Sequence, residues 1–359
     1  MSVLPPVLPS GPLTGPLAVD IVTDRVAWDR EVLALGGHPL QLWGWGEVKA
    51  AGAWRAHRLR VMLPGGATAG LAQVLVRPLP AQFRALSYVP RGPVVAHRYG
   101  GETAKVVYGV GDDDTRAAVS QAVTDWCREN VGGVGITLEP DWPAGTRLEL
   151  PGRRYAPNQI LIPSTLILDL TKPADELLAG MRKSTRYEIR KGSRAGLDIR
   201  RVTDDKEVLR VLDVYKETAE RAGFAIHSDE YYLDVHRSLG DKSVLVATYV
   251  DDVPACFAWC VNSASTSFLL YGGGNDAGRK ATATAPTYWR TIEIAQEAGL
   301  VRYDMNGLLN DGISEFKRSF AQHTDELVGS IDVPFSRWYS TWNSALPTAK
   351  KVVRKLRGH

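Results

Sequence analysis

Short apolar runs rich in β-branched and aromatic residues divide the second half of the chain into strands, and one longer segment has the spacing of a helix. The first two runs are separated by Asp251–Asp252, which predicts a tight turn, and the helix pattern ends at Gly299. Predicted strands cover residues 243–250, 253–261, 267–271 and 301–306, and the predicted helix covers residues 285–298.

The first half of the chain repeats this order of three strands, a helix and a strand. Its predicted strands cover residues 57–63, 70–77, 85–89 and 134–139, with a helix over residues 115–129 before the last strand. The repetition predicts two copies of one α+β unit.

The remaining segments set the expected boundaries. A Pro-, Gly- and Arg-rich stretch over residues 142–155 predicts the connection between the units. We expect a flexible Pro-rich tail over residues 1–17, a first unit over 18–150, a second over 151–321, a segment over 322–346 that packs back on the first unit, and a basic tail over 347–359.

Composition excludes several classes of protein. The formal net charge of +3 is mild for 359 residues, so any basic site must come from local clustering. Three cysteines without a regular spacing argue against a disulfide framework. No apolar run is long enough to span a bilayer and no signal peptide is recognisable, so we expect a cytoplasmic protein.

The strongest local concentration of charge lies between Arg182 and Arg201, where eight Lys or Arg residues face two acidic residues. A helix is predicted from about Pro173 to Gly196. Its basic residues recur at steps of three and four and therefore share one face, which favours an anionic ligand such as a diphosphate, although a solvated charged face gives the same pattern. These residues are Lys183, Arg186, Arg190 and Arg194, whereas Leu178, Met181 and Ile189 lie on another face.

Two lysines stand beside aromatic residues. Lys49 follows Trp43 and Trp45 in QLWGWGEVK, and Lys317 stands next to Phe316 in EFKRSF, after a strand that carries Asp304. Each is either an ordinary surface lysine or a lysine that points into a binding cleft. The scattered histidines form no metal-binding motif, so we expect no metal.

These segments together resemble the FemABX family of aminoacyltransferases, which build peptidoglycan interpeptide bridges. The resemblance covers roughly residues 40 to 340. It rests on QLWGWGEVK, YVPRGPVV, LDL…LLAGMRKSTRYEIRKGSRAGL, YGGGN, VRYDMNG followed by FKRSF, and GSIDVPFSRWY. It implies two tandem GCN5-related N-acyltransferase-like (GNAT-like) units, which is also the element order found in the repeat.

The resemblance implies transfer of an amino acid from aminoacyl-tRNA, as co-substrate, to the stem peptide of a UDP-linked or lipid-linked precursor (UDP-MurNAc-pentapeptide or lipid II). No cofactor is expected, and a lipid-linked precursor would bring the protein to the inner membrane face. Lys317 matches the family's lysine in its final FK motif, and we expect Asp304 to orient the amine. Candidate substrate-binding residues are Lys49, Lys183, Arg186, Tyr187, Arg190 and Tyr271.

Two alternatives stay open. An acyl-CoA-dependent N-acyltransferase would share the fold, but the helix entry after Gly272–Gly274 reads RKATATAPTYW, with Thr and Ala where a glycine-rich pyrophosphate loop is usual. The other alternative is a non-catalytic protein that binds precursor or tRNA. Family members often carry an acidic residue after PRGPVV, which could act as a general base, and this chain has Ala96 and His97 there. The missing carboxylate favours the non-catalytic alternative.

Overall fold

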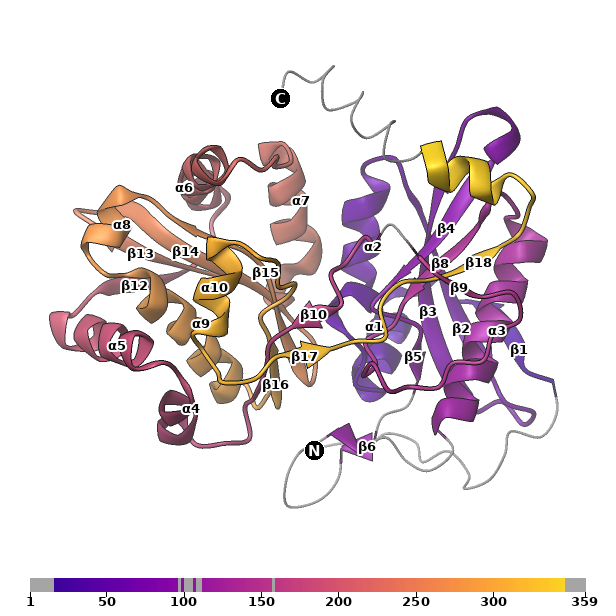
Figure 1. Ribbon diagram of the computed structural model, residues 1–359, viewed down its shortest axis with the longest axis horizontal. Helices are drawn as coiled ribbons and strands as arrows, with labels where there is room; N and C mark the ends of the chain where they lie inside the picture. The colour runs from indigo at the N-terminus through magenta and orange to yellow at the C-terminus, as the bar shows by residue number, and fades with distance from the viewer. Residues whose placement is uncertain (1–15, 96–97, 100–105, 108–111, 157–158, 346–359) are drawn as a thin grey trace. The chain divides into compact units, whose positions relative to one another are not determined.

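The structure is a computed structural model that describes residues 16–95, 98–99, 106–107, 112–156 and 159–345 (Figure 1). The described chain forms two compact units. The first lies within residues 16–163 and 326–345, and the second comprises residues 164–325. Ala96, His97, the basic tail over 347–359 and most of the Pro-rich tail lie outside the described residues.

A six-stranded sheet forms the centre of the second unit. Its neighbouring strands are antiparallel except for β15 (Thr266–Gly274) and β16 (Arg302–Asp304), which run parallel because α9 (Thr284–Glu297) crosses over between them. The spatial order is β11 (Ile167–Asp169), β16, β15, β14 (Val253–Asn262), β13 (Ser243–Val250) and β12 (Asp198–Val202) (Figure 1). The four strands and the helix predicted for this half are confirmed to within a few residues.

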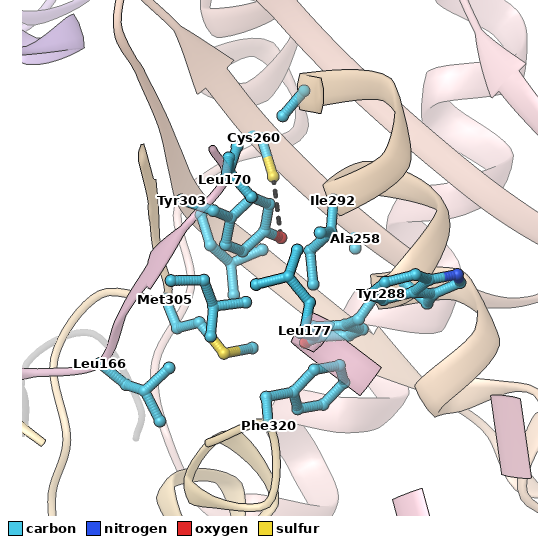
Figure 2. Close-up of a cluster of buried hydrophobic side chains, with 14 of the residues drawn as sticks. Leu166, Leu170, Leu177, Ala258, Cys260, Tyr288, Ile292, Tyr303, Met305 and Phe320 are labelled. Carbon is cyan, nitrogen blue, oxygen red and sulfur yellow. Dashed lines mark hydrogen bonds between the residues drawn. The ribbon is translucent and has the colours of Figure 1, made fainter. Parts of the chain in front are cut away.

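Helices cover both faces of this sheet. On one face, α9 packs with α4 (Ala174–Gly180) and α5 (Lys183–Ala195) in a continuous apolar core (Figure 2). The Sγ of Cys260 lies 3.3 Å from the hydroxyl oxygen of Tyr303 inside this core. On the other face, α6 (Asp205–Ala222) and α7 (Asp229–Leu239) bring Tyr215 and Tyr232 onto Phe257 and Trp259 of β14, with ring centroids 5.4 and 6.3 Å apart.

The single helix predicted from about Pro173 to Gly196 is wrong, because the chain breaks it into α4 and α5. Met181 and Arg182 between them have extended backbone, with ψ of 162° and 147°. The break is stabilised by a bond from outside the two helices and by a side chain of α5. Arg182 N donates to Ser319 O at 2.8 Å, and Arg186 Nη1 donates to the carbonyls of Ala179 and Met181 at 3.0 and 2.6 Å. Tertiary hydrogen bonds thus replace the helical ones.

The first unit repeats the arrangement. Its sheet contains β1 (Ala18–Ile21), β2 (Arg55–Met62), β3 (Thr68–Pro78), β4 (Ala85–Pro90), β8 (Gly135–Glu139), β18 (Ile331–Pro334) and β9 (Arg154–Tyr155) in that order, with β5 (Val94–Val95) also paired to β3. Strands β4 and β8 run parallel, with α3 (Asp112–Asn130) between them in the sequence, as β15 and β16 do with α9. The predicted repeat is therefore present.

The remaining elements of the described residues are short. The N-terminal unit contains α1 (Arg25–Ala34), α2 (Trp43–Ala50), η1 (Pro39–Gln41), η2 (Ala81–Phe83), β6 (Arg98–Tyr99) and β7 (Val106–Val107). The others are η3 (Gly240–Lys242), α8 (Asp276–Lys280), α10 (Gly312–Arg318), β10 (Ser164–Thr165) and β17 (Asp325–Glu326).

The unit boundaries fall later than the sequence predicts, after Pro163 rather than residue 150, and after Asp325 rather than residue 321. Residues 151–163 belong to the first unit because they bond to it. Strand β9 pairs with β18, and the buried carboxylate of Glu139 accepts the backbone N–H groups of Ile160 and Leu161 at 2.8 and 3.0 Å. The returning β18 lies between β8 and β9 and extends the first sheet.

Candidate functional site

Lys317 lies on the short helix α10, which its neighbours hold rigidly. Asp311 begins the helix, and its carboxylate accepts the N–H of Ser314 at 2.7 Å. Phe316 and Phe320 pack on Tyr288 of α9 at centroid distances of 5.0 and 6.2 Å. Because these rings anchor one side of α10 in the core, the orientation of Lys317 is set by packing.

The ammonium group of Lys317 is surrounded by backbone oxygens. Its Nζ donates to the carbonyl of Gly307 at 3.2 Å and to that of Asn306 at 3.4 Å. Burial lowers the pKa of Lys317 to about 8, although the charges of Asp304 and Asp311 act in the opposite direction. The group therefore changes its charge close to physiological pH.

The turn after β16 presents those carbonyls. Asn306 has a φ of 61°, in the left-handed region that asparagine tolerates, and its side chain accepts the N–H of Gly307 at 2.7 Å. Asp304, the last residue of β16, accepts the hydroxyl of Thr165 at 2.5 Å and the N–H of Asn306 at 2.8 Å, both on Oδ1. Among the described residues, its buried Oδ2 has no hydrogen-bond partner.

The strands separate at this turn. Pairing between β15 and β16 ends at Phe268 and Asp304, although β15 continues to Gly274. Lys317 and Asp304 thus lie beside the point where β15 and β16 stop pairing. Lys317 has a titrating ammonium group there, and Asp304 has a carboxylate oxygen without a hydrogen-bond partner among the described residues. Such a pair can stabilise negative charge that develops on a reacting carbonyl and accept a hydrogen bond from an amine.

The structure connects the basic helix α5 with α10. Arg182, just before α5, forms an ion pair with Glu315 at 2.5 Å, and the hydroxyl of Thr185 donates to Ser319 Oγ at 2.7 Å. Lys183, Tyr187 and Arg190 are exposed on α5. Arg186 differs from them because its Nη1 caps the end of α4, which gives this residue a structural use that spacing did not reveal.

Lys49 belongs to the first unit. It lies near the end of α2 with its Nζ 4.4 Å from the ring centroid of Trp45, and burial lowers its pKa to about 8. Trp43, in the first turn of α2, stacks instead with the guanidinium of Arg58 at 3.6 Å. The lysine backed by tryptophan that the sequence suggests is therefore present.

Tyr271 lies in an aromatic cluster that local sequence patterns do not predict. Its ring is 5.1 Å from that of Tyr232, 5.7 Å from Tyr215 and 5.8 Å from Trp259, and a hydrogen bond joins it to Tyr231. Burial raises the pKa of Tyr271 well above its usual value. The pair Tyr231–Tyr232 was the available signal, but only the packing of α6 and α7 on the sheet brings these rings together.

Comparisons with known proteins agree with this architecture. A family model described as an acetyltransferase (GNAT) domain matches residues 179–318, from the end of α4 to α10. No curated protein matches the sequence. The crystal structure of FemX superimposes with a TM-score of 0.75 at 19% identity, covering 88% of this chain and 97% of that chain. The chain has the fold of FemX.

Two further structures are less similar. L-PGS from Bacillus licheniformis matches with a TM-score of 0.52 at 12% identity, over 94% of this chain and 98% of its own. The C-terminal domain of a putative lysylphosphatidylglycerol synthetase from Agrobacterium fabrum matches with a TM-score of 0.51 at 11% identity, over 91% and 96%. The predicted α+β class with two tandem GNAT-like units is confirmed, and the resemblance to the FemABX family holds for the fold.

Within the described ranges, no helix combines the length and the apolar character needed to cross a bilayer.

Proposed function

We propose that this protein transfers an amino acid from aminoacyl-tRNA to an amine of the stem peptide of a peptidoglycan precursor, either UDP-MurNAc-pentapeptide or lipid II. The observation that carries the proposal is the half-buried Lys317 near Asp304, on a fold shared with FemX. The FemABX resemblance of the sequence supplies the substrate class. With lipid II as acceptor, the protein would work at the inner face of the membrane.

The reaction needs few groups because an aminoacyl ester is already activated. The amine nitrogen attacks the ester carbonyl, the amide bond forms, the bond to the ribose oxygen breaks, and a proton passes from the amine to that oxygen. Lys317 in its charged form stabilises the negative charge of the tetrahedral intermediate. The unused Oδ2 of Asp304 accepts a hydrogen bond from the amine and orients it. No further cofactor enters this scheme.

The other candidates bind rather than react. Lys49, desolvated against Trp45, is suited to a precursor phosphate. Tyr271, held by its aromatic neighbours, offers a rigid surface for the stem peptide. Lys183, Arg186, Tyr187 and Arg190 stay predicted ligands of an anionic group.

The test is transfer of radiolabelled glycine, alanine or serine from charged tRNA to UDP-MurNAc-pentapeptide and, separately, to lipid II. We expect labelled product with one donor and one acceptor, and loss of that product with Lys317→Ala. Binding of precursor without product from any pair would contradict the proposal and favour a non-catalytic binding protein.

An acyl-CoA-dependent reaction is the second candidate, because the matching family model is an acetyltransferase domain. The entry into α9 argues against it. Thr282 stands at a φ of 57°, where a glycine would be unstrained, and Thr284 Oγ1 lies 3.5 Å from the sulfur of Cys256. Measured CoA binding with acetyl transfer to a small amine would favour this candidate instead.

A further inference from the structure

The outward face of α5 carries unpaired positive charge. Lys183, Arg190 and Arg194 are exposed, and none of them has an ion-pair partner among the residues that the structure describes. Most other basic side chains on the surface of the second unit are neutralised, as Arg210 is by Glu207. An uncompensated row of charges on a rigid helix indicates an anionic partner.

Packing prevents this face from turning inward. The opposite side of α5 buries Thr185, Ile189 and Gly192. At Gly192 a Cβ atom would lie 2.5 Å from Pro286 of α9, so the two helices are in direct contact there. The basic side chains are consequently held towards solvent along the whole helix.

The length of this face distinguishes between anions. Lys183 and Arg194 are separated by about 16 Å along the helix axis, at the usual rise per residue. Two hollows of about 630 and 380 Å³ flank α5, and Arg190 and Arg194 border both of them. The larger hollow is bordered by the basic side chains of α5 from Lys183 to Arg194, over a length greater than one compact diphosphate can contact.

An aromatic side chain completes the face. Tyr187 is 65% exposed between Lys183 and Arg190. Exposed aromatic rings among basic residues are typical of surfaces that bind single-stranded nucleic acid, because every base can stack on them. Ile189, the only large aliphatic residue of α5, is buried, so the exposed face lacks the aliphatic side chains with which an amphipathic helix inserts into a lipid surface.

The N-terminal end of this face leads to Lys317. The bonds from Arg182 to Glu315 and from Thr185 to Ser319 join the first turn of α5 to α10. The end of an RNA strand that follows α5 would therefore reach α10, the helix that carries Lys317.

We propose that the exposed face of α5, formed by Lys183, Tyr187, Arg190, Lys191 and Arg194, binds the phosphate backbone of the acceptor arm of tRNA. The inference rests on the proposed function and deepens it, because it assigns this face to the RNA co-substrate rather than to the precursor diphosphate. Tyr187 stacks on an unpaired base or sugar near the 3′ end.

The test is the binding of tRNA that carries no amino acid to the full chain, measured as a function of salt concentration. This measurement requires no transfer activity. In the triple variant Lys183→Ala/Arg190→Ala/Arg194→Ala we expect affinity to fall by about 10- to 100-fold and the slope of log K against log salt to become shallower by about 2 to 3. The matched variant Lys206→Ala/Lys216→Ala/Lys242→Ala removes the same charge from the helices on the other face of the sheet. It should change the slope by less than about 1.

Two results would overturn the inference. One is an unchanged tRNA slope in the α5 variant, and the other is a loss of affinity for UDP, or for vesicles of phosphatidylglycerol, with tRNA binding intact. The binding test uses tRNA that carries no amino acid, so its result does not depend on transfer. A protein that binds tRNA through α5 but makes no product would contradict the proposed function and leave this inference standing. Equal melting temperatures of the two triple variants would verify that both fold.

Discussion

The hydroxyl of Thr185 on α5 lies 2.7 Å from that of Ser319, immediately after α10, and both side chains are buried. This bond joins the basic helix to the helix that carries Lys317. Its removal by Thr185→Val should destabilise the protein by about 1 kcal/mol, because Ser319 keeps its bond to the carbonyl of Phe316 and only one hydrogen bond is lost. Urea unfolding measures the effect.

The control for this change is Thr203→Val, at an exposed position, which should alter stability by less than about 0.5 kcal/mol. Equal stabilities of the two variants would show that the contact between α5 and α10 contributes nothing.

Lys317→Met should separate activity from stability. We expect kcat to fall by about 10²- to 10³-fold, as for loss of one oxyanion-stabilising group. Stability should rise at pH 7, by at most about 3 kcal/mol, because the depressed pKa means that the charged form opposes folding. The destabilisation by charged Lys317 is complete below pH 8 and disappears above the ordinary pKa of lysine. Thermal unfolding at pH 7 and initial rates measure both effects.

The neighbouring cation provides the control for Lys317. Arg318 lies 3.9 Å from Glu315 on the surface, so Arg318→Met should change stability by less than about 0.5 kcal/mol and leave kcat nearly intact. Full activity of Lys317→Met would exclude a role for its charge.

The pH dependence of kcat/KM should follow the ionisation of Lys317 in the free enzyme. With a pKa of about 8, the lysine loses its charge as pH rises, so kcat/KM should fall through pH 8. Lys317→Arg stays charged and should have no such descending limb below about pH 10. A limb that persists in the arginine variant would assign the titration to another group.

Asp304→Asn should lower kcat by at least about 10-fold with little loss of stability, since an amide oxygen can still accept the bonds from Thr165 and Asn306. The descending limb should also move to lower pH, because the charge of Asp304 raises the pKa of Lys317. Asp311→Asn is the matched variant. This variant removes a second charge that raises the pKa of Lys317, and asparagine can still cap α10. The descending limb should therefore move to lower pH, with no loss of kcat at low pH.

Lys49→Met tests the first unit. Loss of a charge-assisted bond to a phosphate should raise KM for the precursor by about 10- to 100-fold and leave KM for aminoacyl-tRNA unchanged. Arg30→Met, which removes an exposed cation from α1, should alter neither constant. A change in KM for tRNA alone would place Lys49 at the RNA.

Local patterns in the sequence determined four strands and one helix in each unit, since apolar periodicity and turn residues act within a few positions along the chain. They also determined the duplication, because the same order occurs twice. The lysines of QLWGWGEVK and EFKRSF could be chosen as site candidates from the sequence because their signal is also local: each stands beside aromatic residues in a short motif.

Contacts between distant segments decided the rest. The break between α4 and α5 depends on Ser319, far along the chain, and the late boundary after Pro163 depends on Glu139 and the returning β18. Periodicity could place Arg186 on the basic face, but not show that it caps α4. The lowered pKa of Lys317 arises from desolvation where α10 packs against the turn after β16, and only the tertiary packing creates this contact.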